Sequence, residues 1–286
     1  MKIIKDKTYC VTGGGGFMGS HLVERIISEG AIVKTIGINT NELSTLKEKY
    51  GNKIETLQGD IKDINNVRQL ITKEIVGVFH LAGFKYVGLS EKQTKECVSA
   101  NVIGTMNVLE ISTEQNVEFV LGISTAAAVQ ISSVYGATKM LMERLFNQYQ
   151  VENPNIKFRT IRFDNILYST GSVTSKWKDL IIKGQDITIT DGEATRFFSE
   201  IGETINLIFE CLDSDSPKPY VPNMKSMSIG NLLSAMITKY SPKDSIITIN
   251  RIGLQKGENK HEKMDQNGLY SNEVEQYTIE EILKKI

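Results

Sequence analysis

A cluster of glycines near the N-terminus constrains the fold more than any other feature of this chain. Residues 12–19 read TGGGGFMG and directly follow the β-rich run Thr8–Thr12. Apolar residues at helical spacing then predict an amphipathic helix over Phe17–Ser28. Glycine adopts positive φ at little cost and lets backbone N–H groups approach a ligand closely. Because the positive end of a helix favours an anion, the pattern predicts a phosphate-binding turn between a strand and a helix.

Strand and helix signals alternate through the first half of the chain. This alternation requires crossover connections and a parallel sheet that helices cover on both faces, an α/β fold. We therefore expect a Rossmann-like dinucleotide-binding domain over residues 1–165, with ligands at the carboxyl ends of the strands. The predicted strands are 8–12, 31–38, 53–57, 76–82, 119–124 and 157–163, and the predicted helices are 17–28, 41–50, 64–73, 91–114 and 135–149.

The alternation ends near residue 165, where segments become shorter and turn residues more frequent. We interpret residues 166–286 as a smaller lobe that holds the substrate, with some exchange of strands or helices between the two lobes. The chain ends in a predicted helix over 278–286. Together the two parts predict an enzyme whose site lies between a cofactor domain and a substrate lobe.

Composition and charge exclude several other classes of protein. The 286 residues carry a formal net charge of -1, so no nucleic-acid partner is expected. No apolar run approaches the ~20 residues of a membrane span, and the N-terminus lacks the apolar stretch of a signal peptide. Three widely spaced cysteines favour free thiols in a reducing cytoplasm. The three histidines have no metal-ligand spacing, so no metal site is expected.

Tyr135 and Lys139 are one helical turn apart in the run YGATK, so both side chains project from one face of the predicted helix. A nearby cation lowers the pKa of a phenol, which makes Tyr135 a usable acid or base toward an alcohol or ketone. The spacing alone is not specific. However, Ser124 and Thr125 end the preceding strand, where a hydroxyl can orient a substrate oxygen beside Tyr135. We predict Tyr135, Lys139 and Thr125 as catalytic residues, with Ser124, Tyr135 and Lys139 also contacting the cofactor.

The glycine turn predicts a nicotinamide dinucleotide as the cofactor, and the choice between its two forms depends on the end of the second strand. An acidic residue there usually holds the ribose of NAD, whereas Arg accommodates the phosphate of NADP. This chain has Asn39 and Thr40, and no cation, so we expect NAD(H) rather than NADP(H). Asp60 and Ile61, after the third strand, are placed to reach the adenine. The predicted pyrophosphate contacts are Gly13, Gly16, Phe17, Met18 and Gly19.

Taken together, these residues resemble the extended short-chain dehydrogenase/reductase superfamily. Within it, the chain is most similar to the inverting UDP-N-acetylglucosamine 4,6-dehydratase group, which makes precursors of pseudaminic acid and capsule sugars. The resemblance covers nearly the whole chain. It includes HLAGFKYV at 80–87, NVIG at 101–104, YGATK at 135–139, RFDN at 162–165, GSV at 171–173, ITD at 189–191, TRF at 195–197, GE at 257–258 and HE at 261–262.

The resemblance implies further site residues and an assembly. It adds Leu81, Ala82, Gly83 and Asn101 to the cofactor contacts. It places Lys85, Asn165, Ser172, Val173, Arg196 and Glu258 against a UDP-sugar, with Arg196 as the pyrophosphate partner through a charge-assisted fork. The alternative for Arg196 is a surface ion pair, and for Lys85 and Glu258 a solvated charge. Related enzymes form oligomers through helices of the Rossmann half, so a homo-oligomer, tetramer or hexamer, is expected.

The chain departs from the family where the family carries its acid and base. There the Ser-Thr pair is followed by Asp-Lys, which removes water across C5 and C6 of the sugar. This chain has Ala126 and Ala127 instead, and methyl groups cannot move a proton. It also has Tyr86 where the family commonly carries His, and lacks the Arg expected after the second strand, which favours NAD(H) again.

These departures lead to a first hypothesis about the reaction. Tyr135, with Lys139 and Thr125, would still deprotonate a C4 hydroxyl while NAD+ accepts the hydride. If the substrate is a UDP-N-acetyl sugar that already has a C5–C6 double bond, oxidation at C4 gives a conjugated ketone. Return of the hydride to C6 and protonation of C5 then give UDP-4-keto-6-deoxy-L-AltNAc. This is similar to the second half of a dehydratase split between two proteins, the Pal side of a Pen/Pal pair. Lys85 and Tyr86 are positional candidates for the C5 proton donor.

Three alternatives remain open from the sequence. In the first, the alanines are engineered replacements in a normal UDP-GlcNAc 4,6-dehydratase, although the third alanine, Ala128, needs no engineering. In the second, the chain is a UDP-sugar 4-epimerase or reductase, which requires only Tyr135 and a hydride. In the third, from a different class, the chain is a non-catalytic nucleotide-sugar-binding homologue, and the presence of Tyr135 and Lys139 argues against it.

Overall fold

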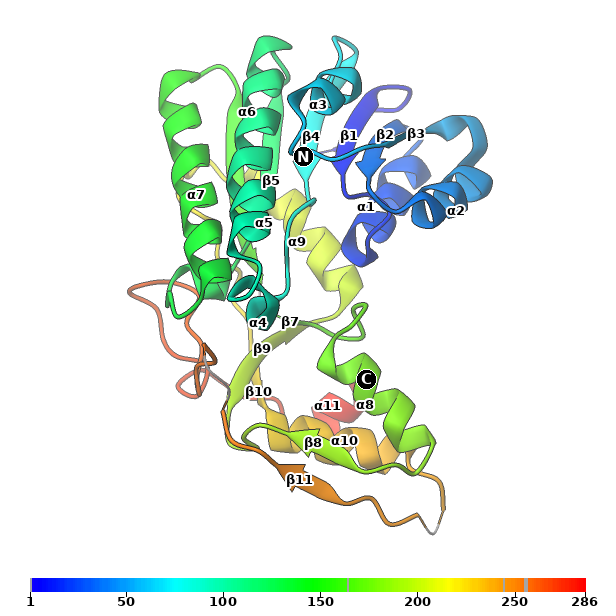
Figure 1. Cartoon of the computed structure of the whole chain (residues 1–286), viewed down its shortest axis with the longest axis vertical. Helices are drawn as coiled ribbons and strands as arrows, with labels where there is room; N and C mark the ends of the chain where they lie inside the picture. Colours follow the sequence, from blue (N-terminus) through cyan, green and yellow to red (C-terminus); the bar gives the residue numbers. More distant parts are fainter. Residues whose placement is uncertain (1, 164, 244, 255–256) are drawn as a thin grey trace.

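Six parallel strands form the central sheet of the first half of the chain (Figure 1). The computed structural model describes residues 2–163, 165–243, 245–254 and 257–286. Each predicted strand is present, and the order β3-β2-β1-β4-β5-β6 confirms the expected Rossmann-like α/β fold. The strands are β1 (Thr8–Thr12), β2 (Ile32–Gly37), β3 (Ile54–Gln58), β4 (Ile75–His80), β5 (Phe119–Thr125) and β6 (Lys157–Phe163).

Helices cover both faces of this sheet because its strands are apolar on both sides. In β1, Tyr9 and Val11 belong to the core on one face and Cys10 to the core on the other. The first face is covered by α1 (Phe17–Ser28), α2 (Thr40–Tyr50) and α9 (Ile201–Asp213). The second face is covered by α3 (Ile64–Leu70), α6 (Gly104–Glu114) and α7 (Val134–Glu152).

The long helix predicted over 91–114 differs from the structure in two ways. Residues 91–93 precede the helix, after the short α4 (Val87–Ser90), and α5 (Thr94–Val98) begins at Thr94. A π-helical turn, Ser99–Ile103, then separates α5 from α6. Apolar periodicity cannot reveal this turn, because it depends on the tertiary hydrogen bonds of the buried Asn101.

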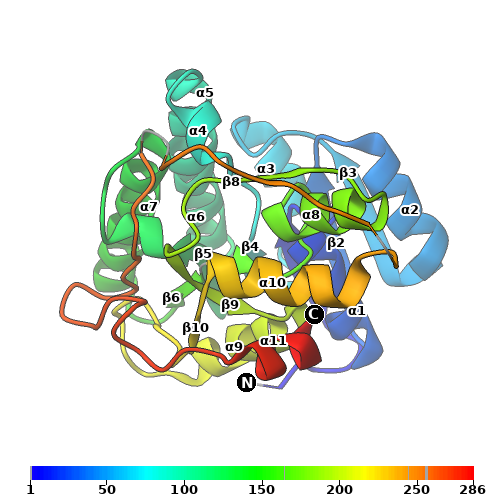
Figure 2. The same cartoon turned by 90° about the horizontal axis from the view of Figure 1, so that it is seen from below.

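The second part of the chain lies at the carboxyl ends of the large sheet, below it in Figure 1. Trp177, Ile181, Leu232, Met236 and Ile282 belong to its own buried core. Figure 2 looks at this part from below, where α10 and α11 lie side by side. Its strands are β7 (Asn165–Ile166), β8 (Ile187–Ile189), β9 (Thr195–Ser199), β10 (Ser226–Ser228) and β11 (Ile249–Arg251), and its helices are α8 (Val173–Ile182), α10 (Ile229–Tyr240) and α11 (Ile279–Lys285).

Helix α9 crosses back to the first part, where Ile205, Ile208 and Phe209 join the core of the large sheet. The chain therefore passes between the two parts more than once, and the division at residue 165 stays a prediction. Within the ranges that the structure describes, no helix combines the length and the apolar character that a bilayer span requires.

Candidate active site

A cavity of about 1120 Å³ lies between the carboxyl ends of the large sheet and the second part of the chain. Residues that follow each of the six parallel strands line it, together with α8 and residues of β8 and β9. All but three of the predicted site residues line this cavity: Gly13, Gly16, Phe17, Met18, Asn39, Asp60, Ile61, Leu81, Ala82, Gly83, Lys85, Ser124, Thr125, Tyr135, Lys139, Asn165, Ser172, Val173, Arg196 and Glu258. The three that do not are Gly19, Thr40 and Asn101.

The glycine turn joins β1 to α1 in the way that its sequence predicts. Gly13 has a φ of +72°, a conformation that L side chains rarely adopt. Gly16 is the N-cap of α1 and faces the cavity, so the start of the helix points toward the space where an anion would bind. Gly19 has a different task, because a Cβ there would lie 2.2 Å from the Gly13 carbonyl oxygen. It allows α1 to pack closely on the turn.

A chain of buried hydrogen bonds fixes the end of β4 against the end of β1. The Thr12 hydroxyl oxygen accepts from the backbone N–H groups of Leu81 and Ala82, both at 3.1 Å. Its proton is therefore donated to Nδ1 of His80, at 2.9 Å, and Nε2 of His80 donates to Thr105 at 3.0 Å. Burial lowers the pKa of His80 to about 3, so the ring is neutral. His80 is a structural residue that holds the cavity wall.

Asn101 lies behind that wall, on the π-helical turn. Its amide oxygen accepts from the Phe84 N–H at 2.7 Å, and its amide nitrogen donates to the Phe84 carbonyl and the Thr138 hydroxyl, each at 3.0 Å. A Cβ on Gly83 would lie 2.7 Å from the amide oxygen of Asn101. Asn101 thus holds the loop that lines the cavity, and the predicted direct contact with a cofactor finds no support in its position.

At the far end of the cavity, Asn39 caps α2 by accepting from the N–H groups of Asn41 and Glu42. Thr40 faces a separate surface depression. Glu42 was not predicted, yet its carboxylate lines the cavity beside the glycine turn, where a Cβ on Gly15 would lie 3.1 Å from it. The Asp60 carboxylate accepts from the backbone N–H of Lys62 at 3.0 Å, which fixes the turn after β3. This end of the cavity therefore carries the acidic side chains of Glu42 and Asp60, with the Lys62 ammonium paired to Asp60 at 3.2 Å.

Tyr135 and Lys139 lie on the first turns of α7, at the edge of the cavity. Nζ of Lys139 donates to the Ile123 carbonyl at 2.8 Å, which ties α7 to β5. Burial lowers the pKa of Lys139 to about 8, and the nearby Cys97 and Glu143 oppose this shift. The Thr125 hydroxyl oxygen accepts from the Ala127 N–H at 3.2 Å and keeps its own proton for donation. This arrangement places a phenol, an ammonium and a hydroxyl around one end of the cavity.

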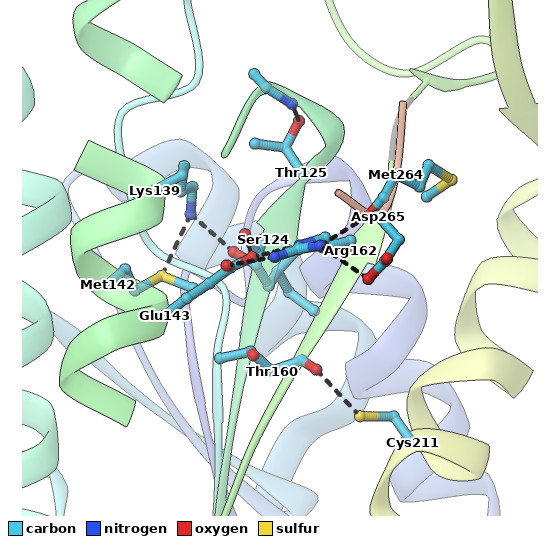
Figure 3. Close-up of polar contacts among 12 residues, drawn as sticks. Ser124, Thr125, Lys139, Met142, Glu143, Thr160, Arg162, Cys211, Met264 and Asp265 are labelled. Carbon is cyan, nitrogen blue, oxygen red and sulfur yellow. Dashed lines mark hydrogen bonds and ion pairs between the residues drawn. The ribbon is translucent and has the colours of Figure 1, made fainter. Parts of the chain in front are cut away.

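Ser124 differs from Thr125 in the direction of its hydroxyl (Figure 3). Its Oγ donates to the Glu143 carboxylate at 2.7 Å, and Glu143 is itself paired with Arg162. Of the two hydroxyls at the end of β5, only that of Thr125 is therefore available to orient a substrate oxygen. Ser124 lines the cavity but gives its only hydroxyl proton to the buried carboxylate.

The predicted substrate contacts come together from both parts of the chain. Nζ of Lys85, in the loop after β4, donates to the Thr170 carbonyl at 3.2 Å and so bridges the two parts. Ser172 caps α8, and the start of that helix faces the cavity. The Arg196 guanidinium pairs with Glu262 at 3.2 Å and donates to two backbone carbonyls. Arg196 is thus engaged in an ion pair, as its alternative expected, but the pair is mostly buried rather than at the surface, and the contact with a UDP-sugar stays a prediction. Glu258 lines the same wall.

The family model for polysaccharide biosynthesis proteins matches residues 9–283. This chain belongs to that family. An uncharacterised membrane protein of Methanocaldococcus jannaschii is 34% identical, over 91% of this chain and 80% of that protein. An inverting UDP-N-acetylglucosamine 4,6-dehydratase of Campylobacter jejuni is 27% identical, over 92% of this chain and 78% of that enzyme. The resemblance is confirmed at the level of the family, and the Pal-like step stays a prediction.

Solved structures agree with the fold. Pen of Bacillus thuringiensis matches with a TM-score of 0.86 and 28% identity, over 92% of this chain and 84% of that chain. A dTDP-glucose 4,6-dehydratase of Streptomyces venezuelae and a UDP-glucose 4-epimerase of Thermus thermophilus, both with NAD bound, reach a TM-score of 0.77 at 18% identity. At that identity they show the fold alone. The predicted assembly and compartment stay predictions.

Neither Ala126 nor Ala127, the alanines that distinguish this family member from the dehydratase pattern, lines the cavity. The Ala126 methyl is 3% exposed and packs with Phe197 and Met264 in a small apolar cluster. The space beside position 126 is therefore filled by hydrophobic side chains, and no described residue of that cluster can replace a missing acid.

Several lining residues were missed by the sequence interpretation. Trp177 of α8 is buried, and its indole N–H donates to the Thr188 carbonyl at 3.4 Å. Phe84, Gln93 and Glu96 line the wall near α5. Phe84 lies within the HLAGFKYV run without having been singled out, and Trp177, Gln93 and Glu96 belong to no motif that the sequence analysis identified. No group of three or more His, Cys, Asp or Glu in the described ranges could hold a metal ion.

Proposed function

We propose that this chain is an NAD(H)-dependent enzyme that isomerises a UDP-6-deoxy-N-acetylhexose-5,6-ene to UDP-4-keto-6-deoxy-L-AltNAc, in pseudaminic acid synthesis. The observation that carries this proposal is the pairing of Tyr135 and Lys139 in the cavity with Ala126 and Ala127 outside it. The first pair can move a proton at C4. The second pair stands where the family carries the Asp-Lys pair that would expel hydroxide from C6.

The cradle at the end of β1 fits a nicotinamide dinucleotide. Gly13 and Gly16 leave the start of α1 open to the cavity, with Phe17, Met18 and Ala82 beside it. When bound, the nicotinamide supplies an acceptor and donor of hydride. The neutral Asn39 and the carboxylate of Glu42 line the part near α2, and a 2′-phosphate would be repelled there. These residues support NAD(H) over NADP(H).

Tyr135 is the proposed base and acid of the reaction. The Lys139 ammonium stabilises the phenolate, which then takes the proton of the C4 hydroxyl, and Thr125 donates a hydrogen bond to the C4 oxygen. The overall change is an isomerisation: C4 loses a hydride and a proton, C6 gains a hydride, and C5 gains a proton. No water leaves, so no acid is needed at C6.

The second part of the chain is proposed to hold the UDP-sugar. The diphosphate would lie between the guanidinium of Arg196 and the start of α8 at Ser172 and Val173, because both favour an anion. Asn165 and Glu258 would contact the nucleoside and the sugar, and Lys85 and Tyr86, which also line the cavity, stay the candidates for the C5 proton donor. Likeness to Pen, one member of the Pen/Pal pair, supports a split pathway, and the alanines favour the Pal side.

The test is a comparison of two substrates with the purified protein. The 5,6-ene sugar nucleotide should yield the 4-keto sugar, an isomer of equal mass that NMR identifies, whereas UDP-GlcNAc should yield no dehydrated product. Tyr135→Phe should lower turnover by about 10²–10⁴-fold and leave NAD binding intact. Dehydration of UDP-GlcNAc would instead indicate a complete 4,6-dehydratase, and inversion of its C4 hydroxyl a 4-epimerase. Binding of NAD with no turnover of any of these sugars would indicate the non-catalytic homologue.

A further inference from the structure

A buried ion pair lies on α7 one turn beyond Lys139 (Figure 3), on the helical face that also carries Tyr135. Arg162 of β6 forms a fork with Glu143 of α7, with Nε to Oε1 at 2.7 Å and Nη2 to Oε2 at 2.8 Å. The two side chains are 11% and 8% exposed, and neither lines the cavity. Ser124 donates to the same Oε1, so this pair joins α7, β5 and β6.

The third nitrogen of the guanidinium reaches a segment that we name the strap, residues 257–265. Nη1 of Arg162 donates to the Met264 carbonyl at 2.8 Å. At the other end of the strap, the Ser132 hydroxyl, just before α7, donates to the Gly257 carbonyl at 2.9 Å. The first part of the chain therefore holds both ends of the strap.

The middle of the strap is held by β9 and contributes to the cavity. The Lys260 carbonyl accepts from the Thr195 N–H at 3.1 Å and from Arg196 at 3.0 Å. Arg196 also pairs with Glu262, another residue of the strap. Glu258 of the strap lines the cavity, so its position and that of Arg196 depend on how the strap is anchored.

A buried ion pair of this kind is a poor source of stability but a precise determinant of geometry. Removing two charges from water costs about as much as their attraction returns, and apolar replacements of both are often neutral or stabilising. A planar guanidinium that satisfies a carboxylate and a carbonyl together fixes direction as well as distance. A fork of this kind between α7 and the strap therefore points to alignment rather than to stability.

We propose that Arg162 is a positioning residue that sets the strap relative to α7 and thereby aligns the UDP-sugar wall with Tyr135. The proposal rests on the proposed function for the identity of the substrate. Arg162 itself touches neither cofactor nor substrate. It acts through Glu143 on the catalytic helix and through Met264 on the strap.

The main variant replaces both charges, Arg162→Met with Glu143→Met, so that no unpaired charge stays buried. Its melting temperature should stay within about 4 °C of the wild type. The KM for the UDP-sugar should rise on the order of tenfold, the loss expected for a charge-assisted hydrogen bond, and the Kd for NAD+ should not change. Backbone amides 257–265 should exchange with deuterated water faster, while those of α1 should not.

Arg162→Lys is the second variant, because an ammonium keeps the charge but cannot fork to both oxygens of Glu143 and to Met264. It should show the same rise in KM and the same faster exchange. Arg159→Lys is the matched control. Arg159 is a buried arginine of the same strand that donates to the Ser214 carbonyl and to Gln150, away from the cavity. Its variant should keep the wild-type KM and strap exchange.

A folded double variant with wild-type KM and wild-type exchange of the strap would overturn the proposal. If the double variant does not fold, the KM and the strap exchange of Arg162→Lys provide the same test. A rise in both supports the proposal, and wild-type values of both overturn it. If the wild type turns over no UDP-sugar, the proposed function fails, but calorimetry with UDP and the exchange of the strap still decide the role of Arg162. The two failures are therefore distinguishable.

Discussion

Position 126 shows how one side chain limits the chemistry of the whole site. The Ala126 methyl packs against Phe197 and Met264, and the cavity begins beyond it. A carboxylate at this position would exchange its water for the apolar side chains around Ala126, which is unfavourable by several kcal/mol. The alanine therefore matches the apolar side chains that pack around it. The sequence alone shows that an acid is missing, but it cannot show this apolar packing.

Restoring the family pair should consequently fail to create a dehydratase. The double change Ala126→Asp with Ala127→Lys should lower the melting temperature and give no dehydrated product from UDP-GlcNAc, as measured by calorimetry and mass spectrometry. Ala127→Lys alone is the control, because Ala127 is half-buried and should tolerate the change. Robust dehydration by the double variant would show that the alanines interrupt an otherwise ordinary 4,6-dehydratase.

Lys139 makes the site sensitive to pH. Burial lowers its pKa from 10.5 to about 8 in the folded chain. The unfolded chain therefore binds more protons between pH 8 and 10.5, so this residue makes the free energy of unfolding rise with pH across that window. Activity has the opposite trend, because loss of the ammonium above pH 8 removes the charge that stabilises the phenolate of Tyr135.

The expected pH–rate profile falls above about pH 8, and Lys139→Met should abolish that limb together with most of the turnover. The same variant should lose the rise in stability between pH 8 and 10.5, measured by chemical denaturation. Lys157→Met is the matched control, since Lys157 also donates to a backbone carbonyl, that of Leu212, but lies outside the cavity. A wild-type profile that stays flat through pH 10 would contradict this role of Lys139.

At the scale of elements, periodicity predicted the strands and α1 but not the parts that tertiary contacts decide. The six parallel strands and Phe17–Ser28 follow from apolar patterns and the glycine turn. The π-helical turn of Ser99–Ile103 does not, because Asn101 bonds to a loop distant in sequence. Helix α9 returns to the large sheet although the sequence places it beyond residue 165. Its amphipathic pattern indicates a buried face but not which core receives it.

The junction of β1 and α1 should be the element most sensitive to one added methyl group. In Gly19→Ala the Cβ would lie 2.2 Å from the Gly13 carbonyl oxygen, so the cradle must shift. We expect a loss of about 1–3 kcal/mol in stability and at least tenfold weaker NAD binding, measured by denaturation and calorimetry. Gly202→Ala is the control, because nothing lies within 4 Å of its added Cβ and helix α9 should gain stability. Unchanged NAD affinity in Gly19→Ala would contradict the assignment of the cradle.

At the scale of the whole molecule, the site exists only because two parts of the chain enclose one cavity. Residues that follow strands could be predicted, because the carboxyl ends of parallel strands meet at one edge. Arg196 and Glu258 came from the family resemblance and do line the cavity. Trp177 and Glu42 were missed, since neither follows a spacing rule. The sequence motifs marked Glu258 and Glu262 of the strap, but not its anchoring, because Gly257 and Met264 are held through their backbone carbonyls.

The central claim is that one cavity moves hydrogen from C4 to C6 of a nucleotide-linked sugar without releasing water. The most direct measurement uses the 5,6-ene sugar nucleotide deuterated at C4, with the purified protein and NAD+ in ordinary water, followed by NMR of the product. The account predicts a 4-keto product whose C6 methyl group carries the deuterium and whose C5 hydrogen comes from the solvent. Deuterium that is lost to the solvent, or that remains at C4, would contradict it.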